Sequence, residues 1–236
     1  ILYLHGGAFV TGSPATHREL AARISASAGL RVISPDYRLS PEHPFPAAIQ
    51  DVLSAYRCLQ SQGYPPSTVI LGGESSGGGL ALQVLLSMRD QGMKLPRAAF
   101  FLSPVTDWIG FDGDSYTSRA HKDPLLSLAQ CQFTASLYVG LGAEGTSLLR
   151  PTEMDLSGLP PMWIQVGDYE ILLSDAERLA QRAAEAGIEV DYKVWPGLWH
   201  VFQTTARLVP EARESLEDLG RFIKKHLADR LGEDRR

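Results

Sequence analysis

Two serines stand among five glycines in LGGESSGGGLALQVLL (71–86), between an apolar run and a segment of helical period. Residues 73–77 have the form G-x-S-x-G, which places a serine on a sharp turn between a strand and a helix. Such a turn exposes the Ser75 hydroxyl and puts the Ser76 amide at a helix N-terminus, where negative charge is favoured. The pattern predicts Ser75 as a nucleophile. The alternative is a glycine-rich turn that only lets the strand and helix pack closely.

A second glycine-containing stretch, YLHGGAFVTGS, follows an apolar run directly at the start of the chain. Adjacent glycines leave backbone N–H groups free to point at one spot, as acyl transfer requires for the developing oxyanion. We expect Gly6, Gly7 and Ala8 to be donors of this kind, together with the Ser76 amide. A plain turn into the next helix is the alternative.

A base and an acid can be placed near the same point. His200, in VWPGLWHVF, follows the predicted strand Val190–Val194 through a Pro-Gly turn. A serine nucleophile needs a base within hydrogen-bond reach, and the base needs an acid to set its tautomer. Asp168 and Glu170 both follow the predicted strand Met162–Val166, so both are candidates for that acid.

The elements that would position these residues alternate along the chain, in the pattern of a parallel sheet covered by helices. The predicted strands are Ile1–Leu4, Arg31–Ser34, Val69–Leu71, Ala98–Leu102, Met162–Val166 and Val190–Val194. The predicted helices are Thr16–Ala28, Ala47–Gln62, Ser76–Gln91, Ser174–Ala186 and a last one from Pro210 to about Ala228. Ser103–Leu159 departs from this rhythm, apart from a helical piece near Leu128–Val139, and is predicted to be an insertion over one end of the sheet.

Composition narrows the class of protein. With 236 residues and 44% hydrophobic residues, the chain can bury one large core. The net charge of −5 comes from interspersed signs, which does not favour nucleic acid as a partner. No apolar stretch approaches the roughly 20 residues of a membrane span. Cys58 and Cys131 form no disulfide framework and no zinc set, so we expect no metal and a reducing, cytoplasmic location.

The chain starts at Ile1 in what is already strand-like sequence. We therefore expect residues 1–236 to be a single catalytic domain that is truncated at its N-terminus, with a pocket-covering insertion at about 103–159.

The quoted motifs resemble those of a known family. HGGAFVTGS, SPDYRLSPEHPFPAAIQD, GGESSGGGLAL, LSPVTDW and WPGLWHVF are similar to the hormone-sensitive-lipase-like branch of the α/β-hydrolases, also called family IV esterases. The similarity runs from Ile1 to about Phe222. It implies an α/β-hydrolase fold with a mostly parallel sheet and helices on both faces. It also implies a carboxylic ester hydrolase without a cofactor, which acts on short or medium acyl chains, and an N-terminal cap and strands that this chain lacks.

The chain departs from the family pattern in three places. Ala8 stands where the family commonly has a third glycine, and Glu74 stands where it has Asp before the nucleophile. The usual catalytic Asp-Pro-Leu is replaced by Glu-Ile-Leu within VGDYEILLSDAERLA. Aligning these two triplets brings the following helix into line with the family's helix and favours Glu170 over Asp168 as the acid.

The resulting prediction is a serine carboxylesterase or lipase-like enzyme with a Ser75–Glu170–His200 triad, an acyl-enzyme on Ser75 and a small-molecule ester as substrate. An amidase, a deacetylase or a lactone hydrolase with the same triad is an alternative, as is a non-catalytic small-molecule receptor of the same fold. His200 argues against the receptor, because receptors of this kind lack the catalytic histidine. The sequence leaves the oligomeric state open, with a homodimer as one option.

Overall fold

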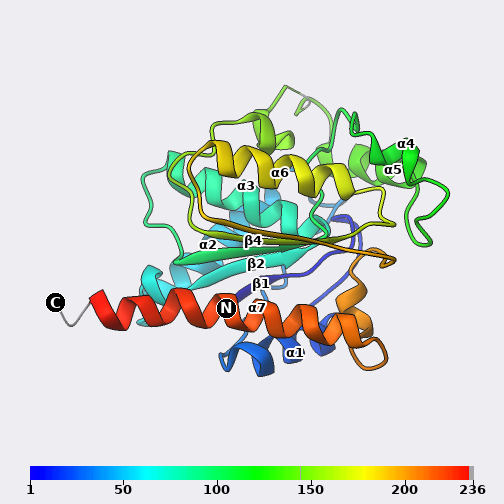
Figure 1. Ribbon diagram of the computed structural model, residues 1–236. Coiled ribbons are helices and arrows are strands. Elements are labelled where there is room, and N and C mark those ends of the chain that lie inside the picture. The colour runs from blue at the N-terminus through cyan, green and yellow to red at the C-terminus, as the bar shows by residue number, and fades with distance from the viewer. Residues whose placement is uncertain (144, 234–236) are drawn as a thin grey trace.

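A sheet of five parallel strands runs through the middle of the protein, with helices on both faces (Figure 1). The computed structural model describes residues 1–143 and 145–233. The strands are β1 (Leu2–Leu4), β2 (Ile70–Glu74), β3 (Ala98–Leu102), β4 (Met162–Gly167) and β5 (Val190–Trp195). The longer helices are α1 (Arg18–Ala28), α2 (Ala47–Ser61), α3 (Ser76–Asp90), α5 (Leu128–Val139), α6 (Leu173–Glu185) and α7 (Pro210–Glu233). Shorter pieces are α4 (Ser115–Ser118) and the 3-10 turns η1 (Pro66–Thr68), η2 (Ser147–Leu149), η3 (Pro151–Glu153) and η4 (Phe202–Thr205).

The strands lie in the sheet in chain order, β1-β2-β3-β4-β5, and each pairs in parallel with the next. All five carboxyl ends therefore meet at one edge, where the loops that follow the strands gather. The predicted α/β fold, with a parallel sheet and helices on both faces, is confirmed.

The two faces of the sheet carry separate apolar layers. Successive side chains of a strand point to opposite faces, so Phe101 packs in the layer of α2, α3 and α6, and Phe100 packs in the layer of α1 and α7. Both rings are fully buried. Because both faces are covered there, the central strand β3 reads as a continuous apolar run, as is typical of parallel sheets.

The predicted strand Arg31–Ser34 is wrong in extent. Only a single bridge, between Ile33 and Leu2, is formed there. It is held by hydrogen bonds from Tyr3 N to Ile33 O (2.9 Å) and from Ile33 N to Ile1 O (2.8 Å). Pro35 follows at once and has no N–H to continue the ladder, which explains why pairing stops.

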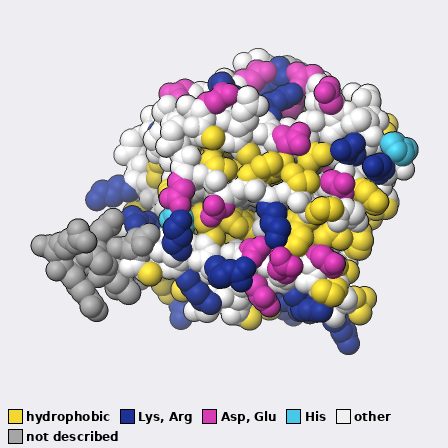
Figure 2. Space-filling model, viewed as in Figure 1, with side chains coloured by type: hydrophobic (Ala, Val, Ile, Leu, Met, Phe, Trp, Pro, Cys, Tyr) yellow, Lys and Arg dark blue, Asp and Glu magenta, His cyan; other side chains and the backbone are white. Residues whose placement is uncertain are grey.

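Charged side chains of both signs are interspersed on the face shown in Figure 2, and hydrophobic side chains gather in a band across the middle of that view. Within the described part of the chain, no helix is both long enough and apolar enough to cross a membrane. The two cysteines are free thiols. That residues 103–159 form a pocket-covering insertion of a single catalytic domain stays a prediction.

Candidate active site

The turn between β2 and α3 carries Ser75 in a backbone conformation that L-residues rarely adopt, with φ 55° and ψ −126°. Its N–H donates to Leu102 O of β3 (2.9 Å), and its carbonyl accepts from Gly78 N (3.1 Å) in the first turn of α3. A Cβ on Gly77 would collide with the carbonyl oxygen of Leu4 in β1. Glycine at that position thus lets helix α3 begin directly against the sheet, and Ser75 stands on the sharp turn that results.

Ser75, His200 and Glu170 lie in one hydrogen-bonded row at the carboxyl edge of the sheet. Ser75 Oγ is 2.9 Å from His200 Nε2, and His200 Nδ1 is 2.8 Å from Glu170 Oε2. A carboxylate only accepts, so Nδ1 carries the proton and Nε2 is left to accept from the Ser75 hydroxyl. Glu170 is fully buried and His200 is 9% exposed. The row has the arrangement that activates a serine hydroxyl.

Asp168 is placed elsewhere. Its Oδ1 accepts from Gly197 N (2.6 Å) and its own N–H donates to Trp195 O (3.0 Å). Both contacts hold the turn after β5, which carries the chain toward His200. The fold therefore brings Glu170 to the imidazole of His200, while Asp168 bonds the backbone of the turn that precedes His200.

A further residue of this row, Ser103, was missed by sequence reasoning. Its hydroxyl donates to Glu170 Oε1 (2.7 Å), and the same oxygen accepts from Gly167 N (2.6 Å). Ser103 Oγ also accepts from Val201 N (3.2 Å), next to His200. The available signal was its position directly after strand Ala98–Leu102, at the edge where Glu170 lies.

The pKa of His200 reflects two opposing effects. Burial of the ring disfavours its charged form, whereas the hydrogen bond and the charge of Glu170 favour it. The negative charges of Glu74 and Asp123 add to the second effect. The net result is a pKa above the ordinary 6.5, as suits a base that must hold a proton for part of a reaction cycle.

The glycine loop after β1 differs from expectation at Gly6. The Gly6 N–H donates to the Glu74 carboxylate and so is not free to bind an oxyanion. For the N–H groups of Gly7, Ala8 and Ser76, no acceptor is found among the described residues. Gly6 is therefore removed from the expected donor set, and the roles of Gly7, Ala8 and Ser76 stay a prediction.

Glu74 sits behind this loop, and only 3% of its surface is exposed. Its Oε1 also lies 3.3 Å from His17 Nε2 and accepts from the Tyr3 hydroxyl at 3.4 Å. Burial raises the pKa of the Glu74 carboxyl, while His17 and the Gly6 N–H oppose that rise. The chain thus uses the acidic residue before the serine to fix the glycine loop.

A mostly apolar cavity of about 250 Å³ opens beside Ser75. One wall comes from the loop after β3, through Val105 and Trp108, and the facing wall comes from Leu126 and from Cys131 and Ala135 of α5. Ala8 and Ser76, with two of the unpaired N–H groups, also line it. Burial raises the pKa of the Cys131 thiol to about 12, so it is a small apolar lining group at neutral pH.

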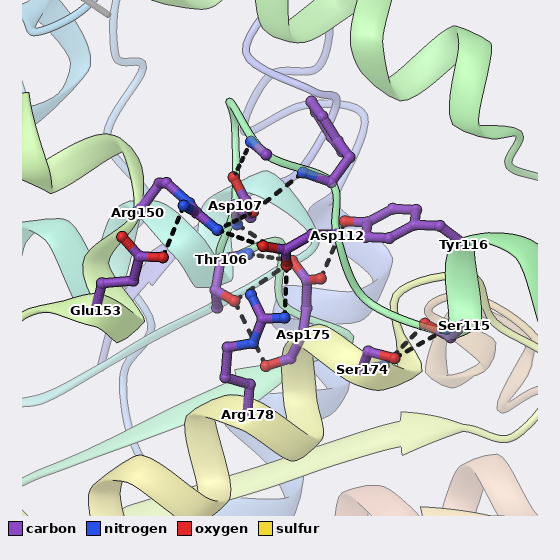
Figure 3. Close-up of polar contacts among 12 residues, drawn as sticks. Thr106, Asp107, Asp112, Ser115, Tyr116, Arg150, Glu153, Ser174, Asp175 and Arg178 are labelled. Carbon is purple, nitrogen blue, oxygen red and sulfur yellow. Dashed lines mark hydrogen bonds and ion pairs between the residues drawn. The ribbon is translucent and has the colours of Figure 1, made fainter. Parts of the chain in front are cut away.

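A polar network fastens the loop of Val105 and Trp108 to α6, as Figure 3 shows. Asp175 Oδ2 accepts from Thr106 N (2.6 Å), and Asp175 Oδ1 accepts from the Tyr116 hydroxyl (3.0 Å). Asp112 lies between the guanidinium groups of Arg150 (2.7 Å) and Arg178 (2.6 Å). Helix α6 begins three residues after Glu170 and also bonds the loop of Val105 and Trp108 through Asp175. One helix therefore holds both the loop that carries Glu170 and one wall of the cavity.

Within residues 1–143 and 145–233, no group of three or more His, Cys, Asp or Glu side chains is arranged to hold a metal ion.

Comparison with known proteins places the chain in a family. A family model for the alpha/beta hydrolase fold matches residues 1–204. The chain belongs to the α/β-hydrolase family. It is 42% identical over 224 residues to an acetyl-hydrolase of Streptomyces hygroscopicus, which covers 95% of this chain and 75% of the relative. It is 36% identical over 239 residues to the carboxylesterase/phospholipase LipF of Mycobacterium tuberculosis, covering 97% of this chain and 62% of the relative.

Similar solved structures agree with this family assignment. An esterase from the bacterial hormone-sensitive lipase family superposes with a TM-score of 0.93 at 43% identity, over 96% of this chain and 76% of that one. The resemblance to hormone-sensitive-lipase-like esterases and the prediction of a carboxylesterase-like or lipase-like enzyme are confirmed.

Proposed function

We propose that this α/β-hydrolase cleaves carboxylic esters of short to medium acyl chains through a covalent intermediate on Ser75. The observation that carries the proposal is the row of hydrogen bonds from Ser75 Oγ to His200 (2.9 Å) and from His200 to Glu170 (2.8 Å). The names of the relatives, acetyl-hydrolase and carboxylesterase, also support hydrolysis of a carboxylic ester bond.

In the first half of the reaction, Ser75 Oγ attacks the ester carbonyl carbon and its proton passes to His200 Nε2. The carbonyl oxygen becomes an oxyanion held by the N–H groups of Gly7, Ala8 and Ser76. When the C–O bond to the alcohol breaks, His200 gives its proton to the leaving oxygen, and the acyl group stays on Ser75.

In the second half, water attacks the acyl carbon while His200 Nε2 takes a proton from that water. The bond to Ser75 Oγ breaks, the proton returns to Oγ, and a carboxylic acid leaves. Glu170 remains ionised throughout and stabilises the imidazolium that forms twice in each cycle.

The cavity size supports the acyl range. An apolar cavity of about 150 Å³ takes one benzene molecule, and the cavity here is about 250 Å³. Its walls are apolar, and α5 bounds one side. A chain of a few to about eight carbons suits this space, whereas a long fatty acyl chain would extend beyond these walls and bury less of its apolar surface in them.

The test is Ser75→Ala against Ser87→Ala, a partly buried serine further along α3. With p-nitrophenyl acetate and butyrate, we expect Ser75→Ala to lose about 10³-fold or more in kcat, and Ser87→Ala to stay within about threefold of wild type. A fluorophosphonate should label Ser75 and no other residue. Labelling at another serine, or an active Ser75→Ala variant, would refute the nucleophile. A matched anilide series then measures whether amides are cleaved as well.

A further inference from the structure

Ser103 joins three loops that the proposed mechanism needs at fixed positions. It follows β3, its hydroxyl donates to Glu170 after β4, and its oxygen accepts from Val201 after β5. Its own N–H donates to Gln165 O in β4 (2.7 Å). Ser103 is fully buried, so no solvent competes for these bonds.

The Glu170 carboxylate has one oxygen for each task. Oε2 accepts from His200, while Oε1 accepts from Ser103 and from Gly167 N. A glutamate side chain has three rotatable bonds, so a fully buried carboxylate of this length can turn away from the imidazole unless its second oxygen is held. Of the two donors to Oε1, Gly167 lies in β4, three residues before Glu170, whereas Ser103 comes from the end of β3 and also accepts from Val201 N, next to His200.

The backbone around these contacts is strained. Ser103 has φ 47° and Val201 has φ 48°, in a region of backbone conformation that costs non-glycine residues free energy. The two residues are also hydrogen-bonded to each other, from Val201 N to Ser103 Oγ. Strain of this kind persists only where the surroundings impose one conformation. A serine that served packing alone would gain nothing from that conformation.

We propose that Ser103 is a positioning residue that holds Glu170 in the side-chain conformation that accepts from His200. It allows a glutamate to serve at the acid position. The inference rests on the proposed function, because it assigns Ser103 to the same triad.

The experiment is a double-mutant cycle between Ser103→Gly and Glu170→Gln. Glycine accepts the positive φ of residue 103 without strain, so Ser103→Gly removes the hydroxyl with little cost to the backbone. Ser103→Ala is made in parallel as a second deletion of the hydroxyl. The kinetics use p-nitrophenyl butyrate, and fluorophosphonate titration normalises each rate to the amount of folded active site.

We expect Ser103→Gly to lower kcat on the order of 10- to 100-fold, with KM within about threefold of wild type, because the lost bond is charge-assisted. In the Glu170→Gln background, the same change should cost less than about threefold, since the group that Ser103 acts through is already altered. The control is Ser215→Ala in α7, a fully buried serine that bonds Gln165 and Gln203 and does not contact the triad. It should lower thermal stability and leave kcat per active site unchanged.

Each outcome decides one question. Ser103→Gly with kcat per active site within about twofold of wild type, or equal losses in both backgrounds, would overturn the positioning role alone. An active Glu170→Gln variant would instead refute the triad, and the role of Ser103 with it.

Discussion

Asp168 and Glu170 are two residues apart and both acidic, but the fold gives them different partners. Asp168 accepts from Gly197 N in the turn before the histidine, and Glu170 accepts from His200 Nδ1 itself. Only the second contact can set the tautomer of the imidazole and stabilise its charged form.

Removal of the negative charge at the two positions should therefore have different effects on kcat. We expect Glu170→Gln to lower kcat by about 10²- to 10⁴-fold, because the imidazolium loses its charged partner, and Asp168→Asn to lower it by less than about tenfold. Steady-state kinetics on a p-nitrophenyl ester, with circular dichroism to verify folding, make the comparison. An inactive Asp168→Asn variant together with an active Glu170→Gln variant would identify Asp168 as the acid of the triad and contradict this prediction.

The pH dependence of kcat/KM should report the raised pKa of His200. The base must be neutral to take the Ser75 proton, so activity is lost as pH falls through that pKa, with a midpoint above 6.5. The Glu170 interaction is one cause of the rise, so the midpoint should move to lower pH in Glu170→Gln and stay in place in Asp168→Asn. Identical acid limbs in all three proteins would speak against this coupling.

Sequence alone places Ser75 and His200, because each follows an apolar run through a turn with a recognisable pattern. It does not place Ser103, since a serine after a strand is common and its contact with Glu170 depends on β3 lying beside β4. The Gly6 prediction failed for a similar reason. The carboxylate that occupies its N–H belongs to Glu74, 68 residues further along the chain.

At the scale of elements, the loop after β3 is joined to the first turns of α6 mainly by carboxylates (Figure 3). Asp175 is buried among neutral donors, and burial raises its pKa from 3.8 to about 6. Asp112 is half exposed, and its hydrogen bond to Arg178 lowers its pKa. The contributions of these two carboxylates to the stability of the fold should therefore change with pH in opposite directions.

This contrast is measurable in the free energy of unfolding. Between pH 3.8 and about 6, the folded state binds more protons at Asp175 than the unfolded state does, so this group's contribution to stability falls as pH rises. Relative to Asp175→Asn, wild type should lose up to about 3 kcal/mol across this window. Relative to Asp112→Asn, wild type should instead gain stability as pH rises. Urea titrations at several pH values test both signs, and parallel curves for all three proteins would contradict the assignment.

The bounds of β3, a continuous apolar run, and of α5 match the prediction. The pattern fails at Arg31–Ser34, where apolar residues suggested a strand but Pro35 ends the ladder after one bridge. Periodicity reports burial, whereas pairing also requires an N–H at each step.

At the scale of the whole molecule, the α1 and α7 layer lies on the face of the sheet opposite α3 (Figure 1). Phe222 of α7 is 4% exposed and packs in this layer. Ser75, His200 and Glu170 gather at the carboxyl edge, and none of these three side chains belongs to this layer.

Damage to this layer should therefore affect stability and not chemistry. We expect Phe222→Ala to lower the free energy of unfolding by about 3–5 kcal/mol through loss of buried area and cavity formation. The kcat per titrated active site should be unchanged at temperatures where the variant is folded. Leu208→Ala, at an 81% exposed position, is the control and should change stability by less than about 0.5 kcal/mol. A Phe222→Ala variant with normal stability, or with lowered kcat per active site, would contradict this separation.

The strand order has a consequence for synthesis on the ribosome. Because β1 to β5 lie in chain order, each strand after β1 finds a neighbouring strand already made when it leaves the ribosome. Helix α1 differs, since its partner α7 is joined to it by Lys224 Nζ and Ser27 O, 197 residues apart. The buried face of α1, with Leu20 and Ile24, thus lacks α7 until the residues of α7 have been synthesised. In a nascent chain this apolar face stays available to chaperones until then.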